Sequence, residues 1–156
     1  EAFIKFTDML KYMYNNPVEE RISVEEEMEY IGNYIDFQEL RHNGHTKVEW
    51  KCTLDDPGRQ IPPMLLITFV ENAFKHGVSY NKPSFVHINI RIAESRLYCV
   101  VRNSRHLQSP DKSGGVGLDN TKKRLRLLFN DDYSLRIDDK SELEYKVELS
   151  IPIKRC

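Results

Sequence analysis

A change in the spacing of apolar residues near residue 46 is the feature that most constrains the fold of this chain. Upstream, apolar residues recur every three or four positions, as on one face of a helix. Downstream, stretches that alternate apolar and polar residues, as half-buried strands do, are separated by two helical patterns. The strand patterns cover residues 46–54, 86–92, 97–102, 133–138 and 145–153, and the helical patterns cover 62–76 and 118–128. This order predicts an α+β fold, a two-layer sandwich with helices on one face of a mixed, mostly antiparallel sheet.

The first 42 residues predict a helical arm. Residues 3–13 form one helical pattern, and a second begins after Ser23, which forms a capping-box pattern with Glu26. An arm with a single apolar stripe has few partners of its own, so we expect it to pack on a second helix, such as one from another subunit. We therefore predict an arm at 1–42 and a separate domain at 43–156. The stripes are Phe3, Phe6, Leu10 and Met13 in the first helix, and Val24, Met28, Ile31 and Ile35 in the second.

The length and charge of the chain argue against several classes of protein. Its 156 residues are enough for one domain of ordinary size. With 23 Lys and Arg against 24 Asp and Glu, the net charge is −1, so we expect no binding to nucleic acid, which requires a positive excess. No apolar run reaches the ~18 residues of a membrane-spanning helix. The three cysteines are widely spaced, which favours neither disulfides nor a zinc site and fits a reducing cytoplasm.

A polar cluster ends the helix predicted at 62–76, which opens with two prolines and is almost wholly apolar in its first half. Asn72, Lys75 and His76 are three or four residues apart, so their side chains project near one face. An amide oxygen beside an ammonium suits a magnesium–phosphate group, because the amide binds the cation and the lysine neutralises a phosphate oxygen. The alternative is a helix end in solvent, with Glu71 and Lys75 as an ordinary surface pair.

A glycine cluster precedes the helical pattern at 118–128. Three of the seven glycines, Gly114, Gly115 and Gly117, lie within four residues. Glycine lets the backbone approach a ligand closely, and the free N–H groups of a helix start favour phosphate. The cluster lacks the Walker spacing, and no strand runs directly into it as a dinucleotide fingerprint requires. A plain hinge between a loop and a helix is the alternative. The predicted apolar face of the helix is Leu118, Thr121, Leu125 and Leu128, and on another side Asn120 and Arg124 are placed to add a cation to the phosphates.

Taken together, the two clusters resemble the ATP-binding domain with the Bergerat fold that gyrase, histidine kinases and MutL share. More specifically, the chain resembles sensor histidine kinases of the LytS/YehU type, and the resemblance covers nearly its whole length. The stretch that starts at Pro62-Pro63 and ends in Val70-Glu71-Asn72-Ala73-Phe74-Lys75-His76-Gly77 resembles the N box of that family. Gly114-Gly115-Val116-Gly117-Leu118-Asp119-Asn120, followed by Arg124-Leu125, resembles its glycine box. Residues 8–12 and 26–35 resemble the end of its dimerisation region.

This resemblance implies a role for each matching residue. Asn72 would hold Mg²⁺ between the phosphates of ATP, and Lys75 and His76 would contact phosphate oxygens. Glu71 would polarise the histidine that accepts the phosphoryl group. The loop at 104–113 would form a lid over the nucleotide. The residues implied to surround the nucleotide from the glycine box and its helix are Gly114, Gly115, Gly117, Leu118, Asn120 and Arg124.

The adenine end of the site departs from the family pattern at two places. Asn103 stands at the end of its strand, where many relatives carry an adenine-binding Asp. An Asn carbonyl still accepts a hydrogen bond from the adenine amino group, without the assistance of a charge. Glu144-Tyr145 stands near where relatives often have Gly-Thr beside the adenine.

The resemblance also implies what a longer protein would do. The γ-phosphoryl group of ATP would move to a histidine and then to an aspartate of a response regulator of the LytTR type. The protein would be a homodimer through its arm, with this domain in the cytoplasm and an inner-membrane anchor in other segments. Because the chain starts at Glu1 inside a helical pattern, we expect it to be a fragment. The acceptor histidine of the family lies upstream, in an Asn-Pro-His-Phe stretch, so we expect the fragment to bind Mg·ATP without phosphorylating itself.

Other functions stay open beside this one. A degenerate nucleotide binder that acts only as a dimer scaffold or signalling relay fits Asn103 and the absent Gly-Thr. An ATPase of the same fold is disfavoured, because such relatives place a Glu one turn before the Asn to activate water, and Thr68 holds that position here. A third alternative is a helical-arm interaction protein with a glycine hinge. It does not explain why the N box and the glycine box occur together.

Overall fold

The computed structural model describes residues 21–42, 45–56, 58–106 and 115–154. The helix predicted at 3–13, Gly114 and most of the predicted lid lie outside these ranges. In chain order the elements are β1 (Ile22–Ser23), α2 (Val24–Arg41), β2 (Thr46–Thr53), β3 (Gln60–Ile61), α3 (Ile67–Gly77), β4 (Ser84–Ala93), β5 (Arg96–Ser104), α4 (Gly115–Phe129), β6 (Ser134–Asp138) and β7 (Glu144–Pro152). Within the described part of the chain, none of the helices combines the length and the apolar character that crossing a membrane requires.

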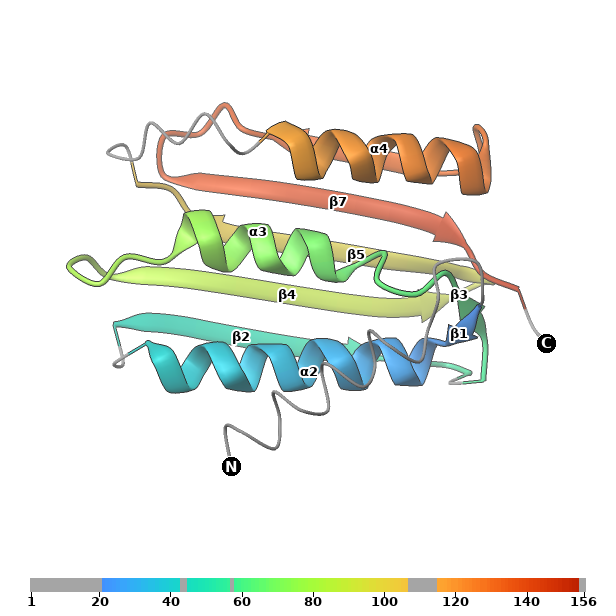
Figure 1. The fold of residues 1–156 in the computed structure, drawn as a ribbon, viewed down its shortest axis with the longest axis horizontal. Coiled ribbons are helices and arrows are strands. Elements are labelled where there is room, and N and C mark those ends of the chain that lie inside the picture. Colours follow the sequence, from blue (N-terminus) through green and yellow to red (C-terminus); the bar gives the residue numbers. More distant parts are fainter. Residues whose placement is uncertain (1–20, 43–44, 57, 107–114, 155–156) are drawn as a thin grey trace.

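The larger sheet has five strands in the order β2-β4-β5-β7-β6. β2 and β4 run parallel, whereas the other neighbouring pairs are antiparallel. The helices α2, α3 and α4 all lie on one face of this sheet (Figure 1). The predicted two-layer sandwich with a mixed, mostly antiparallel sheet is therefore confirmed. A small second sheet, formed by β1 and β3, was not predicted.

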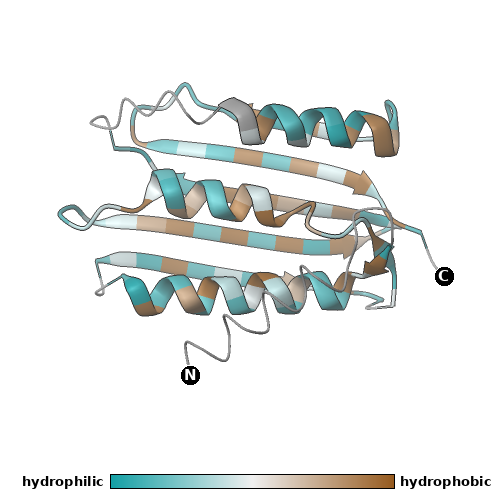
Figure 2. Cartoon of the chain, in the orientation of Figure 1, coloured by the Kyte–Doolittle hydropathy of each residue, from teal (hydrophilic) through white to brown (hydrophobic). Residues whose placement is uncertain are grey.

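The alternating pattern of each strand explains how the sheet meets the helices. Along β4, Val86, Ile88, Ile90 and Ile92 are buried, while the residues between them are exposed or half-buried. Figure 2 shows the same alternation of hydrophobic and hydrophilic residues on the strands. Glu94 and Ser95 join β4 to β5 with φ values of 52° and 62°. Two consecutive positive φ values are typical of the tight turns that match the twist of a hairpin.

The predicted capping box starts α2. The Ser23 hydroxyl accepts from the Glu26 N–H at 3.2 Å, and the Glu26 carboxylate accepts from the Ser23 N–H at 2.9 Å. The apolar stripe of α2 belongs to the same buried core as the sheet and α3. The helix therefore buries its stripe within the domain, without a helix from another subunit. Whether residues 1–42 form a separate dimerisation region stays a prediction.

The start predicted for the helix at 62–76 is wrong. Residues 62–66 are not helical, and α3 begins at Ile67. Met64 has a φ of 56°, in the left-handed region that a helix cannot include. Two buried prolines and this turn lead the chain from β3 into α3. The turn is held by side chains from α2 and α4, which no local pattern in 62–76 could indicate.

α4 confirms the helix predicted at 118–128, with one correction to its apolar face. Thr121 and Leu125 are buried and Leu118 is half-buried, but Leu128 is 37% exposed. Phe129 is buried in its place. The reason is geometric, because residue 129 lies four positions after 125 and eleven after 118, which returns it to the same side of the helix.

Candidate functional site

The two predicted clusters lie on α3 and α4, which contact each other on the same face of the sheet (Figure 1). The two helices run in opposite directions, so the last turns of α3 and the first turn of α4 lie toward the same end of the sheet. Asn72, in the middle of α3, is half-buried, whereas Gly117, in the first turn of α4, is exposed. The backbone positions of Asn72 and Gly117 therefore lie on two helices that contact each other on the same face of the sheet.

Glu71 is directed toward α2. Burial raises the pKa of both Tyr30 and Tyr34 to about 12, and the nearby charge of Glu71 is the second cause of each shift. The side chain of Glu71 is exposed as a whole, but partial burial of its carboxyl group raises its own pKa. A carboxylate with a raised pKa is a better proton acceptor than an ordinary one. Its predicted role toward an acceptor imidazole stays a prediction, and α2 is the element that it faces here.

Replacing Glu71 by Gln is expected to stabilise the domain slightly at neutral pH. A folded-state pKa above the unfolded value means that the charged form is disfavoured in the folded state, so stability falls as pH rises through that pKa. The expected gain at pH 7 is below about 1 kcal/mol, since solvent screens an exposed group. Below the unfolded pKa the two proteins should be equally stable. Urea unfolding at pH 3.5 and pH 7 measures this difference, and an equal effect at both values would contradict it.

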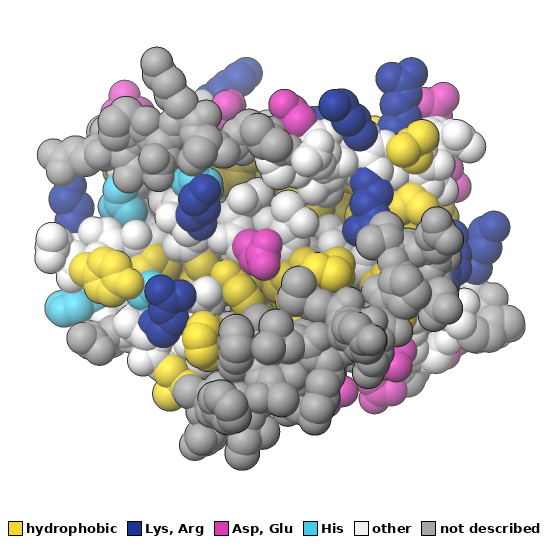
Figure 3. Space-filling view, in the orientation of Figure 1, with side chains coloured by type: hydrophobic (Ala, Val, Ile, Leu, Met, Phe, Trp, Pro, Cys, Tyr) yellow, Lys and Arg dark blue, Asp and Glu magenta, His cyan; other side chains and the backbone are white. Residues whose placement is uncertain are grey.

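Lys75 lies beside α2. Together with residues of α2 and the segment after α3, it lines a cavity of about 300 Å³. Apolar side chains are visible between α2 and α3 on this side of the molecule (Figure 3). The contact of Lys75 with phosphate stays a prediction, as does that of His76, which is half-buried in the last turn of α3. The cavity is lined by Tyr34, Gln38, Arg41, His42, Phe74, Lys75, Val78 and Tyr80.

Asn103 lies at the end of β5 and packs against the last residue of α3. It is only 2% exposed, and its Nδ2 donates to the Ser104 carbonyl at 2.8 Å. One of the two amide N–H groups is thus used, and the amide oxygen is the atom that would accept from an adenine amino group. A Cβ added at Gly77 would lie 2.5 Å from the Asn103 Cβ. Gly77, the last residue of the stretch that resembles the N box, permits this close approach.

Ser104 joins the end of α3 to β4. Its hydroxyl donates to the Gly77 carbonyl at 3.0 Å and accepts from the Phe85 N–H at 2.7 Å. The His106 Nε2 lies 3.2 Å from the same Gly77 carbonyl and 3.0 Å from the Ser84 hydroxyl. This network holds the end of α3 against the strands that carry Asn103. No sequence pattern singled out Ser104, because its partners are distant in the chain.

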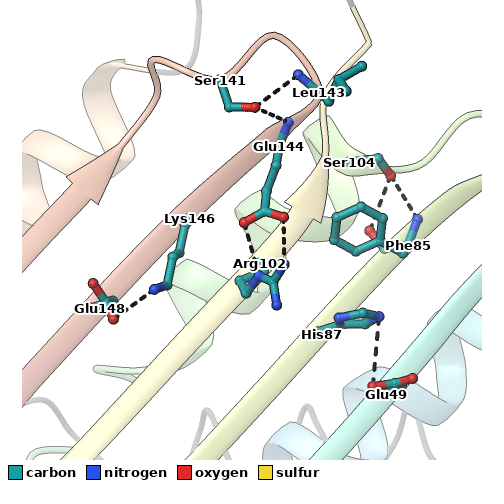
Figure 4. A network of polar contacts seen from close by, with 10 residues as sticks. All are labelled: Glu49, Phe85, His87, Arg102, Ser104, Ser141, Leu143, Glu144, Lys146 and Glu148. Atoms are coloured by element: carbon teal, nitrogen blue, oxygen red, sulfur yellow. Dashed lines mark hydrogen bonds and ion pairs between the residues drawn. The ribbon is translucent and has the colours of Figure 1, made fainter.

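Tyr145, which the resemblance put near a Gly-Thr pair of relatives, lies beside Asn103. The two residues are directly opposite each other in the pairing of β5 with β7. Burial raises the pKa of the half-buried Tyr145. Its neighbour Glu144 points to the other face of the sheet, where its carboxylate accepts two hydrogen bonds from Arg102, at 2.9 and 2.7 Å (Figure 4). Glu144 therefore belongs to the polar, helix-free face.

Packing against the described residues does not explain the glycine at 117. Among the described residues, none comes within 4 Å of a Cβ added at Gly117. A glycine in a helix costs about 0.5–1 kcal/mol relative to alanine, and packing provides no reason for one here. Close approach of a ligand would explain a glycine at this position. Leu118 is half-buried and Asn120 is exposed on the same helix.

Arg124 reaches the turn before α3. Its guanidinium donates from Nη2 to the Pro63 carbonyl at 2.7 Å and from Nη1 to the Met64 carbonyl at 3.3 Å. The carboxylate of Glu27 accepts from backbone N–H groups of the same turn. Glu27 was not predicted to hold this turn. Its position three residues after Val24 and four before Ile31, within the apolar stripe, was the available signal.

The chemistry of these residues fits magnesium only together with phosphate. Within the described ranges, no three His, Cys, Asp or Glu side chains gather as a metal site. Mg²⁺ in nucleotide sites is commonly held by one or two protein oxygens, with phosphate oxygens and water completing the set. One amide oxygen from Asn72 is sufficient as the protein's share of such a site.

Several known proteins are similar to this chain in sequence. No family model matches it. The sensor histidine kinase BtsS of Escherichia coli (strain K12) is 26% identical over 135 residues, which cover 85% of this chain. The sensor histidine kinase YesM of Bacillus subtilis (strain 168) is 23% identical over 162 residues and 96% of this chain. The sensor protein LytS of Staphylococcus saprophyticus is 26% identical over 130 residues and 74% of this chain. This chain is similar in sequence to sensor histidine kinases.

This chain spans about a quarter of the length of those proteins, 24% of BtsS and 28% of YesM. Solved structures agree on its fold. The catalytic domain of the histidine kinase ThkA superposes with a TM-score of 0.57 at 15% identity, over 85% of this chain and 94% of that one. The mycobacterial sensor histidine kinase MprB gives 0.56 at 15% identity, over 88% and 99%. The fold is that of a histidine kinase catalytic domain.

Proposed function

We propose that this chain is the ATP-binding catalytic domain of a sensor histidine kinase. The observation that carries the proposal is the adjacency of α3 and α4, with Asn72 on one and an otherwise unexplained glycine, Gly117, at the start of the other. In a relative of sensor kinases, this arrangement suits a magnesium-bound triphosphate.

In this proposal, residues of α3 and α4 contact different parts of the nucleotide. Asn72 holds Mg²⁺, which neutralises charge on the phosphates, while Lys75 and His76 contact phosphate oxygens. The N–H groups at the start of α4 receive the phosphate chain, because glycine there leaves the backbone open. The Asn103 oxygen accepts from the adenine amino group. Catalysis rests on positioning and on neutralising charge, as is usual for phosphoryl transfer.

The activity of the longer protein follows from the same proposal. The γ-phosphoryl group passes to a histidine and then to an aspartate of a response regulator, which we propose is of the LytTR type. We also propose that the protein is a homodimer through residues 1–42 and that this domain lies on the cytoplasmic side of an inner membrane. The printed sequence has no Asn-Pro-His-Phe stretch to accept the phosphoryl group.

Calorimetric titration of the 156-residue chain with ATP tests the proposal. We expect binding when Mg²⁺ is present and at least a tenfold loss when EDTA removes it, since the metal neutralises the phosphates. Incubation with γ-labelled ATP should leave no label on histidine. An affinity for ATP that is the same with and without Mg²⁺, or no binding of ATP at all, would favour the alternative of a degenerate nucleotide binder that serves as a scaffold. Asn103 and Tyr145, which lie opposite each other, are the two residues that support this alternative.

A further inference from the structure

The turn that leads into α3 is held from two sides by charged side chains of the neighbouring helices. Met64, at its centre, has a φ of 56°, which for a residue with a side chain costs about 1 kcal/mol or more. Such a conformation persists only where surrounding contacts determine it. The contacts at Met64 therefore determine the conformation of this turn.

Glu27 holds the turn from α2. Its side chain is 0% exposed, and its two carboxylate oxygens accept from the Met64 N–H at 2.9 Å and the Leu66 N–H at 3.2 Å. A buried carboxylate is unfavourable unless hydrogen bonds satisfy its oxygens, and here backbone donors do so. These N–H groups lie just before α3, so the carboxylate also faces the positive end of that helix.

Arg124 holds the same turn from α4. It donates to the carbonyls of Pro63 and Met64, so Met64 is bonded through its N–H to α2 and through its carbonyl to α4. Arg124 lies seven residues after Gly117, which is about two helical turns. The guanidinium thus points to the start of α3, away from the glycine-rich start of its own helix.

We propose that Glu27 and Arg124 are positioning residues that fix α3 relative to α4 through the turn at Pro63 and Met64. Because Asn72 follows this turn on α3 and Gly117 precedes Arg124 on α4, the clamp sets the distance between the two halves of the nucleotide site. Arg124 then acts on the nucleotide through the backbone, not by touching phosphate. The inference rests on the proposed function, since it concerns the same site.

Four variants test the clamp: Arg124→Ala, Arg124→Gln, Glu27→Gln and the matched control Arg126→Ala, whose side chain is exposed on the same helix. Affinities for Mg·ATP and Mg·ADP are measured by calorimetry well below each melting temperature. We expect Arg124→Ala to weaken both nucleotides by the same factor, about tenfold, the loss equivalent to one charged hydrogen bond. Arg124→Gln should recover part of the loss, because its amide still donates to a carbonyl. Glu27→Gln should act like Arg124→Ala, and Arg126→Ala should bind as the unmodified protein.

Hydrogen exchange of the nucleotide-free protein separates failure of the clamp from failure of the proposed function. Exchange at the N–H groups of Met64 and Leu66 should become faster in Arg124→Ala and stay unchanged in Arg126→Ala. A larger loss for ATP than for ADP, with Arg124→Gln as weak as Arg124→Ala, would identify a phosphate contact and overturn the inference. Unchanged affinity in folded Arg124→Ala would overturn it as well. If the unmodified protein binds no nucleotide, the proposed function fails, and unchanged exchange at Met64 and Leu66 then rejects the clamp.

Discussion

Replacing Asn72 by Ala is expected to weaken Mg²⁺-dependent binding of ATP by about a hundredfold while the domain stays folded. In the proposed site, the Asn72 amide oxygen is the protein ligand of the metal, and alanine removes it without a substitute. The helix itself should tolerate the change, because alanine is the best helix former and Asn72 is only half-buried. Calorimetric titration with ATP, with and without Mg²⁺, measures the loss directly.

Two further variants make the Asn72 result specific. Asn89→Ala removes the same side chain from an exposed position on β4 and should leave binding unchanged. Asn72→Asp restores an oxygen ligand and should bind more tightly than Asn72→Ala in the presence of Mg²⁺. If Asn72→Ala binds ATP like the unmodified protein, with the same dependence on Mg²⁺, the assignment of the metal to this side chain is wrong.

Replacing Gly77 by Ala is expected to destabilise the domain by about 2–3 kcal/mol. The added Cβ would lie 2.5 Å from the Asn103 Cβ, 2.8 Å from its Nδ2 and 2.9 Å from its Cγ. Asn103 is buried and hydrogen-bonded, and the Gly77 carbonyl accepts from Ser104, so neither side of the contact moves freely. An alanine in a helix normally stabilises a protein, so destabilisation here would be a direct sign of the clash. Urea unfolding at pH 7 measures it.

Gly117→Ala is the matched control for that substitution. Its Cβ would meet no described residue within 4 Å, so its stability should stay equal or rise by about 0.5 kcal/mol. The same variant should bind Mg·ATP about tenfold more weakly, since the new methyl group occupies the space proposed for the nucleotide. Equal destabilisation by both substitutions would mean that the Asn103 contact does not explain the requirement for glycine at 77.

Local patterns predicted the secondary structure well because each reports on a single element. The alternation of β4 and the capping box of Ser23 and Glu26 depend on residues at most a few positions apart. The start of α3 was missed for the opposite reason. Proline is tolerated in the first turn of a helix, so 62–66 had a helical pattern, and only Glu27 and Arg124 hold Met64 in a conformation outside it.

The candidate site was likewise predicted only in part. The types and spacing of Asn72, Lys75 and the glycines indicated a nucleotide site, and resemblance to a known family connected them. The directions in which the side chains point were not predictable. Glu71 faces α2 because of the way that α2 and α3 pack, and Arg124 bonds to the backbone before α3 because α4 lies beside it.

By itself, the sequence determined most of the helices and strands and the apolar faces of most of them, and it predicted which residues would serve a magnesium-bound nucleotide, since hydrophobic periodicity and side-chain chemistry are local properties. Only the tertiary structure decided that α2 belongs to the core, that Gly77 must be glycine and that Glu27 and Arg124 share one turn. Each of these depends on atoms brought within a few ångströms from distant parts of the chain, and close packing and backbone hydrogen bonds, not sequence spacing, set such contacts.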